Sequence, residues 1–236
     1  MKKFILNDLH IGHEDTKYSV IREAINYIRS TAEDGDKIWG LGDWFHMAEE
    51  GVDACRNHAV TEELITLADE IPTELVTGNH DYELEDHSDL FRPIQIVKPF
   101  EEDGFYHFEE NGIWYGHGNQ FDPACKYVHR RLRKWMARLT GKKTPGVLKG
   151  EKPTGTYLQA VNIVHSQAIL ELQDKDYKGI VLGHTHFPLL RPEIPFLING
   201  GDMMDSLTFT VQDDHGFHLM QWNGSRWQEI SHLKIY

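Results

Sequence analysis

The 236-residue chain has few cysteines and no long apolar run. Its two cysteines, Cys55 and Cys125, have neither the spacing of a zinc site nor that of a disulfide framework, so we expect reduced thiols. No apolar run approaches the roughly 18 residues that span a bilayer. The apolar run at residues 4–6 is too short for a secretory signal peptide. These absences predict a cytoplasmic protein.

Acidic residues outnumber basic ones, and the net charge of −13 argues against a protein coated by nucleic acid. The charge is uneven, because residues 126–149 contain nine Lys or Arg and no Asp or Glu. Hydrophobic residues make up 40% and charged residues 26%, as in soluble globular domains. We expect residues 1–236 to form a single domain with a sizeable core, and the basic stretch to be an insertion within it.

Short apolar runs alternate with helical periodicity in the first 76 residues. Runs at 4–6, 37–41 and 73–76 predict strands, and the spacing within 18–31 and 60–70 predicts helices between them. The remaining elements expected are a helix over 157–172 and strands at 105–108, 113–115, 179–182, 206–211, 217–221 and 227–233. This order predicts an α/β fold in which two packed sheets carry helices on the outside.

Side chains that could bind a metal follow five of the predicted strands. They are Asp8 and His10, Asp43, Asn79 with His80 and Asp81, His117, and His184 with His186. Sites in α/β proteins gather beyond the carboxyl ends of the strands. In Asp-x-His and His-x-His, an extended chain would send both side chains to one face, so that each pair could bind one ion.

Carboxylate, imidazole and amide oxygen together suit borderline divalent ions such as Mn, Fe or Zn. The seven candidate ligands are Asp8, His10, Asp43, Asn79, His117, His184 and His186. Seven are too many for one tetrahedral ion, but they suffice for two ions roughly 3.5–4 Å apart that share a carboxylate, as in two-metal hydrolases. Each motif alone is common in ordinary turns, but five together at strand ends favour a metal centre.

These motifs resemble those of the calcineurin-like metallophosphoesterases. The resemblance rests on Asp8-Leu9-His10, Gly42-Asp43, Gly78-Asn79-His80-Asp81, Gly116-His117 and Gly183-His184-Thr185-His186. It implies a four-layer αββα sandwich of two mixed β-sheets and a centre of two divalent metal ions, with Mn favoured and Fe or Zn as alternatives. It further implies one ion on Asp8, His10, Asp43 and His186, and a second on Asp43, Asn79, His117 and His184, with Asp43 bridging.

The resemblance leaves His80 as an imidazole that can face the substrate phosphate. Hydrolysis would proceed by a hydroxide that bridges the two ions, without a covalent enzyme intermediate. As an imidazolium, His80 would stabilise charge on the phosphoryl group or protonate the leaving group. Asp81 would accept a hydrogen bond from His80 and favour its protonated form. His46, three residues after Asp43, could contact the substrate.

The basic stretch has apolar residues at helical spacing over 128–139, which predicts a cationic amphipathic helix. We expect residues 123–155 to form a small helical and loop cap, in which Arg130, Arg131 and Lys134 could contact substrate. Peripheral contact with an anionic membrane and simple packing of a surface helix are the alternatives. Asp122 could cap the helix predicted to begin near Pro123 or orient a ligand.

The insertion and the motif Gly200-Gly201-Asp202 resemble those of the UDP-2,3-diacylglucosamine diphosphatases. That resemblance implies a phosphorylated substrate such as a UDP-sugar-lipid pyrophosphate. One alternative is a nucleotide phosphodiesterase or nuclease on the same metal centre, with nucleic acid as the less favoured partner. Another is a non-catalytic interaction scaffold, which the presence of all seven ligands and His80 argues against.

Overall fold

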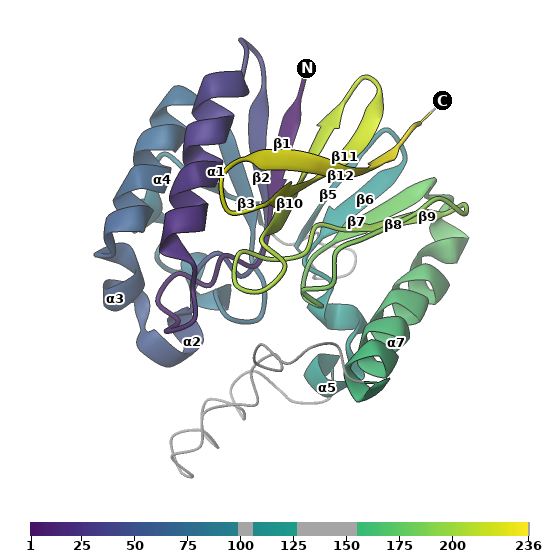
Figure 1. Cartoon of the computed structure of the whole chain (residues 1–236). Helices are drawn as coiled ribbons and strands as arrows, with labels where there is room; N and C mark the ends of the chain where they lie inside the picture. The colour runs from purple at the N-terminus through teal and green to yellow at the C-terminus, as the bar shows by residue number, and fades with distance from the viewer. Residues whose placement is uncertain (99–105, 127–154, 236) are drawn as a thin grey trace.

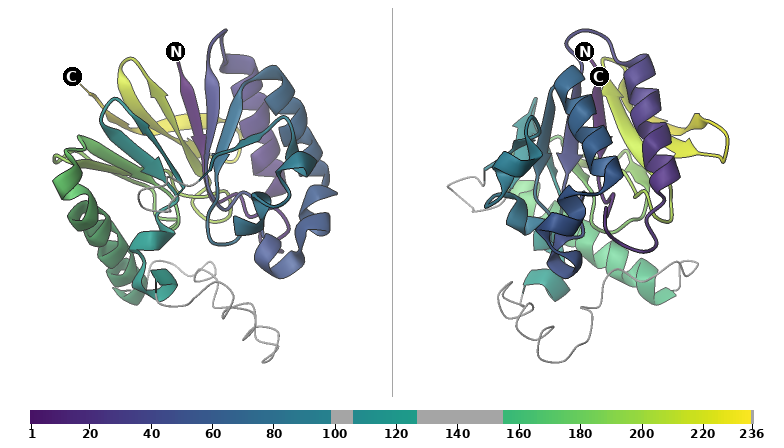
Figure 2. Two further views of the ribbon diagram at one scale, coloured as in Figure 1. Left: turned by 180° about the vertical axis from the view of Figure 1, so that it is seen from behind. Right: turned by 90° about the vertical axis from the view of Figure 1, so that its left-hand side faces the viewer.

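The computed structural model describes residues 1–98, 106–126 and 155–235. Two β-sheets face each other, and helices cover both outer faces (Figure 1; Figure 2 gives the view from behind). The predicted α/β class with two mixed sheets is confirmed. Residues 127–154 of the predicted cap, with Arg130, Arg131 and Lys134, lie outside the described residues.

The first sheet has seven strands in the order β12-β11-β10-β1-β2-β3-β4. Strands β1 to β4 are parallel, whereas β10 pairs with β1 in the antiparallel sense and begins an antiparallel meander. The strands are β1 (Lys3–Leu6), β2 (Lys37–Leu41), β3 (Thr73–Val76), β4 (Gln95–Ile96), β10 (Thr208–Asp213), β11 (Gly216–Trp222) and β12 (Trp227–Leu233).

The second sheet has five strands in the order β5-β6-β7-β9-β8. The three central strands are parallel and the two edge strands run antiparallel to their neighbours. The strands are β5 (His107–Glu110), β6 (Ile113–Gly116), β7 (Gly179–Leu182), β8 (Leu189–Arg191) and β9 (Phe196–Asn199).

Helices α1 (Tyr18–Thr31) and α4 (Ala59–Glu70) cover the first sheet, and α7 (Gly155–Leu172) covers the second (Figures 1 and 2). The remaining helices are short. They are α2 (Met47–Glu50), α3 (Val52–Arg56), α5 (Pro123–Lys126) and the 3-10 turns η1 (Tyr82–Leu84), η2 (Ser88–Phe91), η3 (Asn119–Phe121) and η4 (Gln173–Lys175). None of the described helices is long and apolar enough to cross a bilayer, and the predicted cytoplasmic location stays a prediction.

Alternate residues of the central strands supply different layers of the core. In β1, Ile5 packs between the sheets, whereas Phe4 and Leu6 pack against the layer that contains α1 and α4. Strand β7 repeats the pattern: Val181 points between the sheets and its neighbours pack against α7. Because both faces of these strands are buried, their sequences are continuous apolar runs, as is usual for parallel strands covered on both sides.

Strand β10 begins at Thr208, two residues later than the predicted start at residue 206. The side chain of Asp202 accepts hydrogen bonds from the backbone N–H groups of Met204 and Asp205, each at 2.5 Å. This hydrogen bonding holds residues 203–206 in a turn, which delays the strand.

The buried position of Ile198 between the sheets gives a first prediction. Ile198→Ala should lower the free energy of unfolding by about 2–5 kcal/mol, because it leaves a cavity beside fully buried neighbours. Ile163→Ala is the matched control, since Ile163 lies on α7 with 49% of its surface exposed, and should change stability by less than about 0.5 kcal/mol. Urea unfolding measures both; equal losses would contradict this packing.

Candidate metal centre

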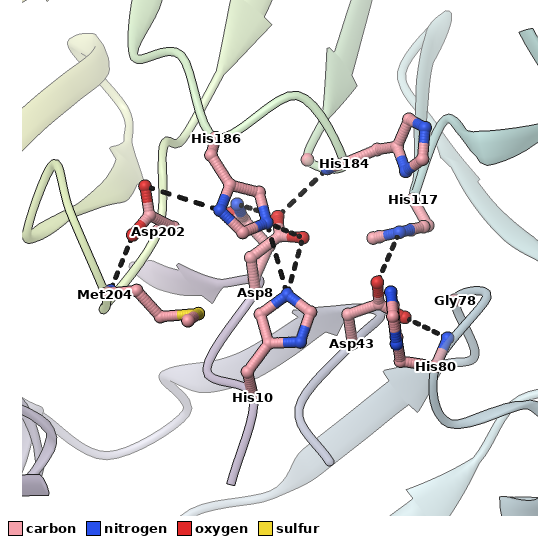
Figure 3. Close-up of polar contacts among 12 residues, drawn as sticks. Asp8, His10, Asp43, Gly78, His80, His117, His184, His186, Asp202 and Met204 are labelled. Carbon is pink, nitrogen blue, oxygen red and sulfur yellow. Dashed lines mark hydrogen bonds and ion pairs between the residues drawn. The ribbon is translucent and has the colours of Figure 1, made fainter. Parts of the chain in front are cut away.

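The polar clusters predicted at the strand ends meet at one edge of the sandwich (Figure 3). Strands β1, β2 and β3 are parallel in the first sheet, and β6 and β7 are parallel in the second. The loop after β1 is pinned to the loop after β2, since the backbone N–H of Asp8 donates to Gly42 at 3.1 Å and that of His10 to Asp43 at 2.9 Å. Residues far apart in the sequence therefore share one site.

Several of the predicted ligands have a left-handed backbone. The φ angles are 53° for Asp8, 49° for His10, 51° for Asp43, 64° for His184 and 55° for His186. Such angles are uncommon outside glycine and are concentrated at functional sites. The expectation of an extended chain through Asp-x-His and His-x-His was therefore wrong, because the hydrogen bonds between loops turn the chain at alternate residues.

The first group of donors comprises Asp8, His10 and His186, all buried. Nε2 of His186 lies 3.2 Å from Nε2 of His10 and 3.2 Å from Oδ1 of Asp8. Two ring nitrogens and one carboxylate oxygen thus point toward a common centre. They are the ligand types that a borderline divalent ion takes.

The carboxylate of Asp8 provides a test of whether a cation fits. Its Oδ2 accepts hydrogen bonds from the side chain of Asn7 and from the backbone N–H of His184, both at 2.9 Å. Its Oδ1 is buried and forms no hydrogen bond among the described residues, although Nε2 of His186 faces it at 3.2 Å. A buried anionic oxygen without a donor is costly unless a positive charge faces it. A metal ion on Asp8, His10 and His186 would satisfy this oxygen.

The second group lies around Asp43. Nε2 of His117 is 3.1 Å from Oδ2 of Asp43 and 3.2 Å from Oδ1 of Asn79. Nδ1 of His117 is 2.9 Å from the carbonyl oxygen of Leu41, so it carries the ring proton and Nε2 is the free ligand atom. Asp43 also forms a group with Asp8 and His117, whose possible ligand atoms lie within 4.8 Å of one another.

His184 completes the second group through a different nitrogen. Its Nε2 lies 2.9 Å from Oδ2 of Asp122, and its ring centre is 5.1 Å from that of His117. When Nε2 donates to the carboxylate, Nδ1 becomes the ligand atom, as in carboxylate–histidine–metal arrangements. Oδ1 of Asp122 also accepts the backbone N–H of Ala124 at 2.8 Å, so Asp122 both caps α5 and orients His184. Cys125 lies nearby, with Sγ 4.0 Å from Nε2 of His184.

The electrostatics of Asp43 favour its charged form. Burial opposes ionisation, but attraction to His117 and His80 outweighs it and holds the pKa of Asp43 well below its usual range. The pKa of His117 is raised in turn, because the charges of Asp43 and Asp8 overcome the effect of burial.

The pKa values of His184 and His186, the two histidines after β7, are also raised by neighbouring carboxylates. Burial alone would lower the pKa of His184, yet its hydrogen bond to Asp122 raises it to about 10. Burial likewise disfavours the charged form of His186, while Asp8 and Asp202 raise its pKa to about 9. Protons on these rings supply positive charge to buried carboxylates, and a divalent ion would have to displace them on binding.

The loop after β3 places His80 beside Asp43, with the backbone N–H of His80 donating to Oδ1 of Asp43 at 2.7 Å. The predicted hydrogen bond between His80 and Asp81 was wrong. Nδ1 of His80 lies 3.1 Å from Oε2 of Glu49, while Asp81 accepts the backbone N–H groups of Gly78 at 2.7 Å and Trp44 at 2.8 Å. The carboxyl of Asp81 is turned under the loop, where burial raises its pKa to about 7.

His46 lies inside the same cluster. Its ring stacks on that of His80 with centres 4.7 Å apart, and its Nδ1 is 3.3 Å from Nδ1 of His10. Burial lowers the pKa of His46 to about 4, so the ring is neutral near pH 7. Its predicted contact with substrate stays a prediction. The sequence motifs did not single out Glu49, although its i, i+3 spacing from His46 on one helical turn could have suggested the pair.

Comparison with known proteins agrees with this geometry. The chain matches the family described as calcineurin-like phosphoesterase over residues 1–188, a span that contains all seven predicted ligands. The fold is similar to a single mutant of Vps29 from Entamoeba histolytica, with TM-score 0.53, 11% identity and coverage of 100% of both chains. Vacuolar Protein Sorting 29 from Cryptosporidium parvum has TM-score 0.50 and 15% identity over 99% of this chain and 98% of that chain. At these identities the likeness concerns the fold alone. No match was found among curated protein sequences.

The close approach of Gly78 to Asp43 gives a second prediction. A Cβ at residue 78 would meet the Asp43 carboxylate and its backbone nitrogen, the latter at 2.8 Å, so Gly78→Ala must displace that carboxylate. We expect Mn affinity to fall about 10–100-fold in isothermal titration calorimetry. Gly155→Ala is the control, because a Cβ there meets nothing within 4 Å. Unchanged Mn binding by Gly78→Ala would exclude Asp43 as the shared ligand.

Proposed function

Because the chain belongs to the calcineurin-like phosphoesterase family, we propose that it is a metal-dependent hydrolase of phosphate esters or pyrophosphates. The observation that carries this proposal is the buried Oδ1 of Asp8, which forms no hydrogen bond among the described residues and lies beside the nitrogens of His10 and His186. Two imidazole nitrogens and a carboxylate oxygen that face one another in a buried site are the ligand types that a borderline divalent ion takes.

The proposed cofactors are two divalent ions. One would be held by Asp8, His10, Asp43 and His186, and the other by Asp43, Asn79, His117 and His184. The mixed donor set supports Mn, with Fe or Zn as alternatives. When bound, such ions neutralise phosphoryl oxygens and lower the pKa of a water molecule.

Among the residues of this chain, His80 is the one that we propose to take part in the reaction itself. Burial disfavours its charged form, but the carboxylates of Asp43 and Glu49 raise its pKa above the ordinary value. Its Nδ1 is held by Glu49, which leaves Nε2 to donate a proton. The proton would go to a phosphoryl oxygen or to the leaving oxygen, whose developing negative charge it stabilises.

The substrate proposal is more specific. A UDP-sugar-lipid pyrophosphate is supported by the basic composition of residues 126–149 and by the Gly200-Gly201-Asp202 motif, in which Oδ2 of Asp202 lies 3.8 Å from Nδ1 of His186. The same composition supports peripheral contact with an anionic membrane. A nucleotide phosphodiesterase or nuclease is the second candidate, because the same metal centre would serve it and the basic residues could bind a phosphate backbone.

A screen for hydrolysis with added Mn separates these substrates and is our third prediction. UDP-linked lipids should be cleaved faster than dinucleotides, cyclic nucleotides or single-stranded DNA. Faster cleavage of DNA, together with an affinity that falls steeply with salt, would favour the nuclease instead. Failure to cleave any of these esters would favour the non-catalytic scaffold.

His80→Ala gives the fourth prediction. Wild-type protein with Mn should hydrolyse bis-p-nitrophenyl phosphate, and EDTA should abolish the activity. His80→Ala should lower kcat by roughly 10²–10⁴-fold while the Mn content by elemental analysis stays that of the wild type, since His80 is not a ligand. His87→Ala, at a histidine outside the cluster, is the control. Near-normal turnover by His80→Ala would remove His80 from the mechanism.

A further inference from the structure

A row of hydrogen-bonding side chains joins His10 to His80 by way of helix α2. Glu49, on α2, has one carboxylate oxygen in contact with two imidazoles: Oε2 lies 3.2 Å from Nε2 of His46 and 3.1 Å from Nδ1 of His80. The two rings are stacked with an angle of 16° between their planes. One largely buried carboxylate therefore contacts both rings at once, with its side chain 15% exposed.

The nitrogen contacts fix which atoms carry protons. Nε2 of His10 faces Nε2 of His186 in the first donor group, so it is the ligand atom and Nδ1 carries the ring proton. That Nδ1 lies 3.3 Å from Nδ1 of His46, which must accept the proton. With Nδ1 as the acceptor, the proton of His46 lies on Nε2, the atom in contact with Glu49.

The same oxygen of Glu49 accepts the Nδ1–H of His80. An acceptor at Nδ1 fixes the orientation of the ring and leaves Nε2 as the atom that can hold a second proton. The ring of His80 lies 5.1 Å from that of His10, between Glu49 and the donor groups. The sequence predicted that Asp81 accepts the hydrogen bond from His80. In the structure Glu49 does so instead, and both oxygens of Asp81 accept hydrogen bonds from backbone N–H groups.

We propose that Glu49 is the positioning residue for His80 in phosphoester hydrolysis, and that through His46 it also fixes the orientation of His10. This inference rests on the proposed function. In this arrangement Glu49 acts through the two imidazoles. The substrate class it serves is that of esters whose leaving oxygen or phosphoryl oxygen takes a proton from His80.

The helix itself does not depend on the Glu49 side chain for its place. The backbone N–H of Ala48 donates to the carbonyl oxygen of His80 at 3.0 Å, and Met47 is buried in the core. Glu49→Gln removes the charge and keeps the size of the side chain, so α2 should remain docked. Glu50→Gln is the matched control, since Glu50 lies on the same helical turn with its side chain exposed.

The kinetic test, our fifth prediction, uses the Mn-loaded full chain and bis-p-nitrophenyl phosphate. Glu49→Gln should lower kcat about 10–100-fold with KM within about twofold, and Glu50→Gln should match the wild type. In the Mn-saturated protein, the double variant Glu49→Gln/His80→Ala should be no slower than His80→Ala alone, because Glu49 affects kcat through His80 and its link to His10 through His46 affects metal binding. Independent losses that multiply in the double variant, or unchanged kcat in Glu49→Gln, would overturn the proposal.

A second readout does not depend on turnover. In long-range ¹H–¹⁵N spectra of the zinc-loaded protein, which is diamagnetic, His46 should carry its proton on Nε2, and Glu49→Gln should shift the Nδ1 resonance of His80. A proton on Nδ1 of His46 would contradict the assignment. If the wild type hydrolyses no ester but these spectra agree, the proposed function fails and the positioning of His80 stands.

Discussion

The whole site depends on burying two carboxylates, Asp8 and Asp43, where water cannot solvate them. Such groups remain charged only if positive charge and hydrogen-bond donors surround them. Backbone N–H groups satisfy one oxygen of each, from His184 for Asp8 and from His80 for Asp43. The other oxygens face imidazole nitrogens of His186 and His117, an arrangement that a bound cation would also satisfy.

Hydrogen bonds to residues outside the proposed ligand set fix the orientation of three imidazole rings. The carbonyl of Leu41 fixes His117, the carboxylate of Asp122 fixes His184, and Glu49 fixes His80. In each case the partner accepts a hydrogen bond from one ring nitrogen, which leaves the opposite nitrogen available for another contact. The orientation of these rings is thus set by residues outside the proposed ligand set.

The helices and strands whose residues follow a clear apolar periodicity were predictable from the sequence. The helix at 18–31 and the strands at 37–41 and 227–233 occur at the predicted residues, because apolar periodicity and burial coincide there. The left-handed backbone at Asp8 and His184 was not predictable, since it depends on hydrogen bonds between loops distant in sequence. The partner of His80 was missed for the same reason: Asp81 is its neighbour in sequence, but Glu49 is its neighbour in space.

Anomalous-difference density from crystals grown with Mn tests the central claim most directly. Two peaks should appear roughly 3.5–4 Å apart, with the Asp43 carboxylate between them and Asp8 and His117 on opposite sides. A single peak away from Asp43, or no peak at a Mn concentration that supports hydrolysis, would contradict a centre built on that carboxylate.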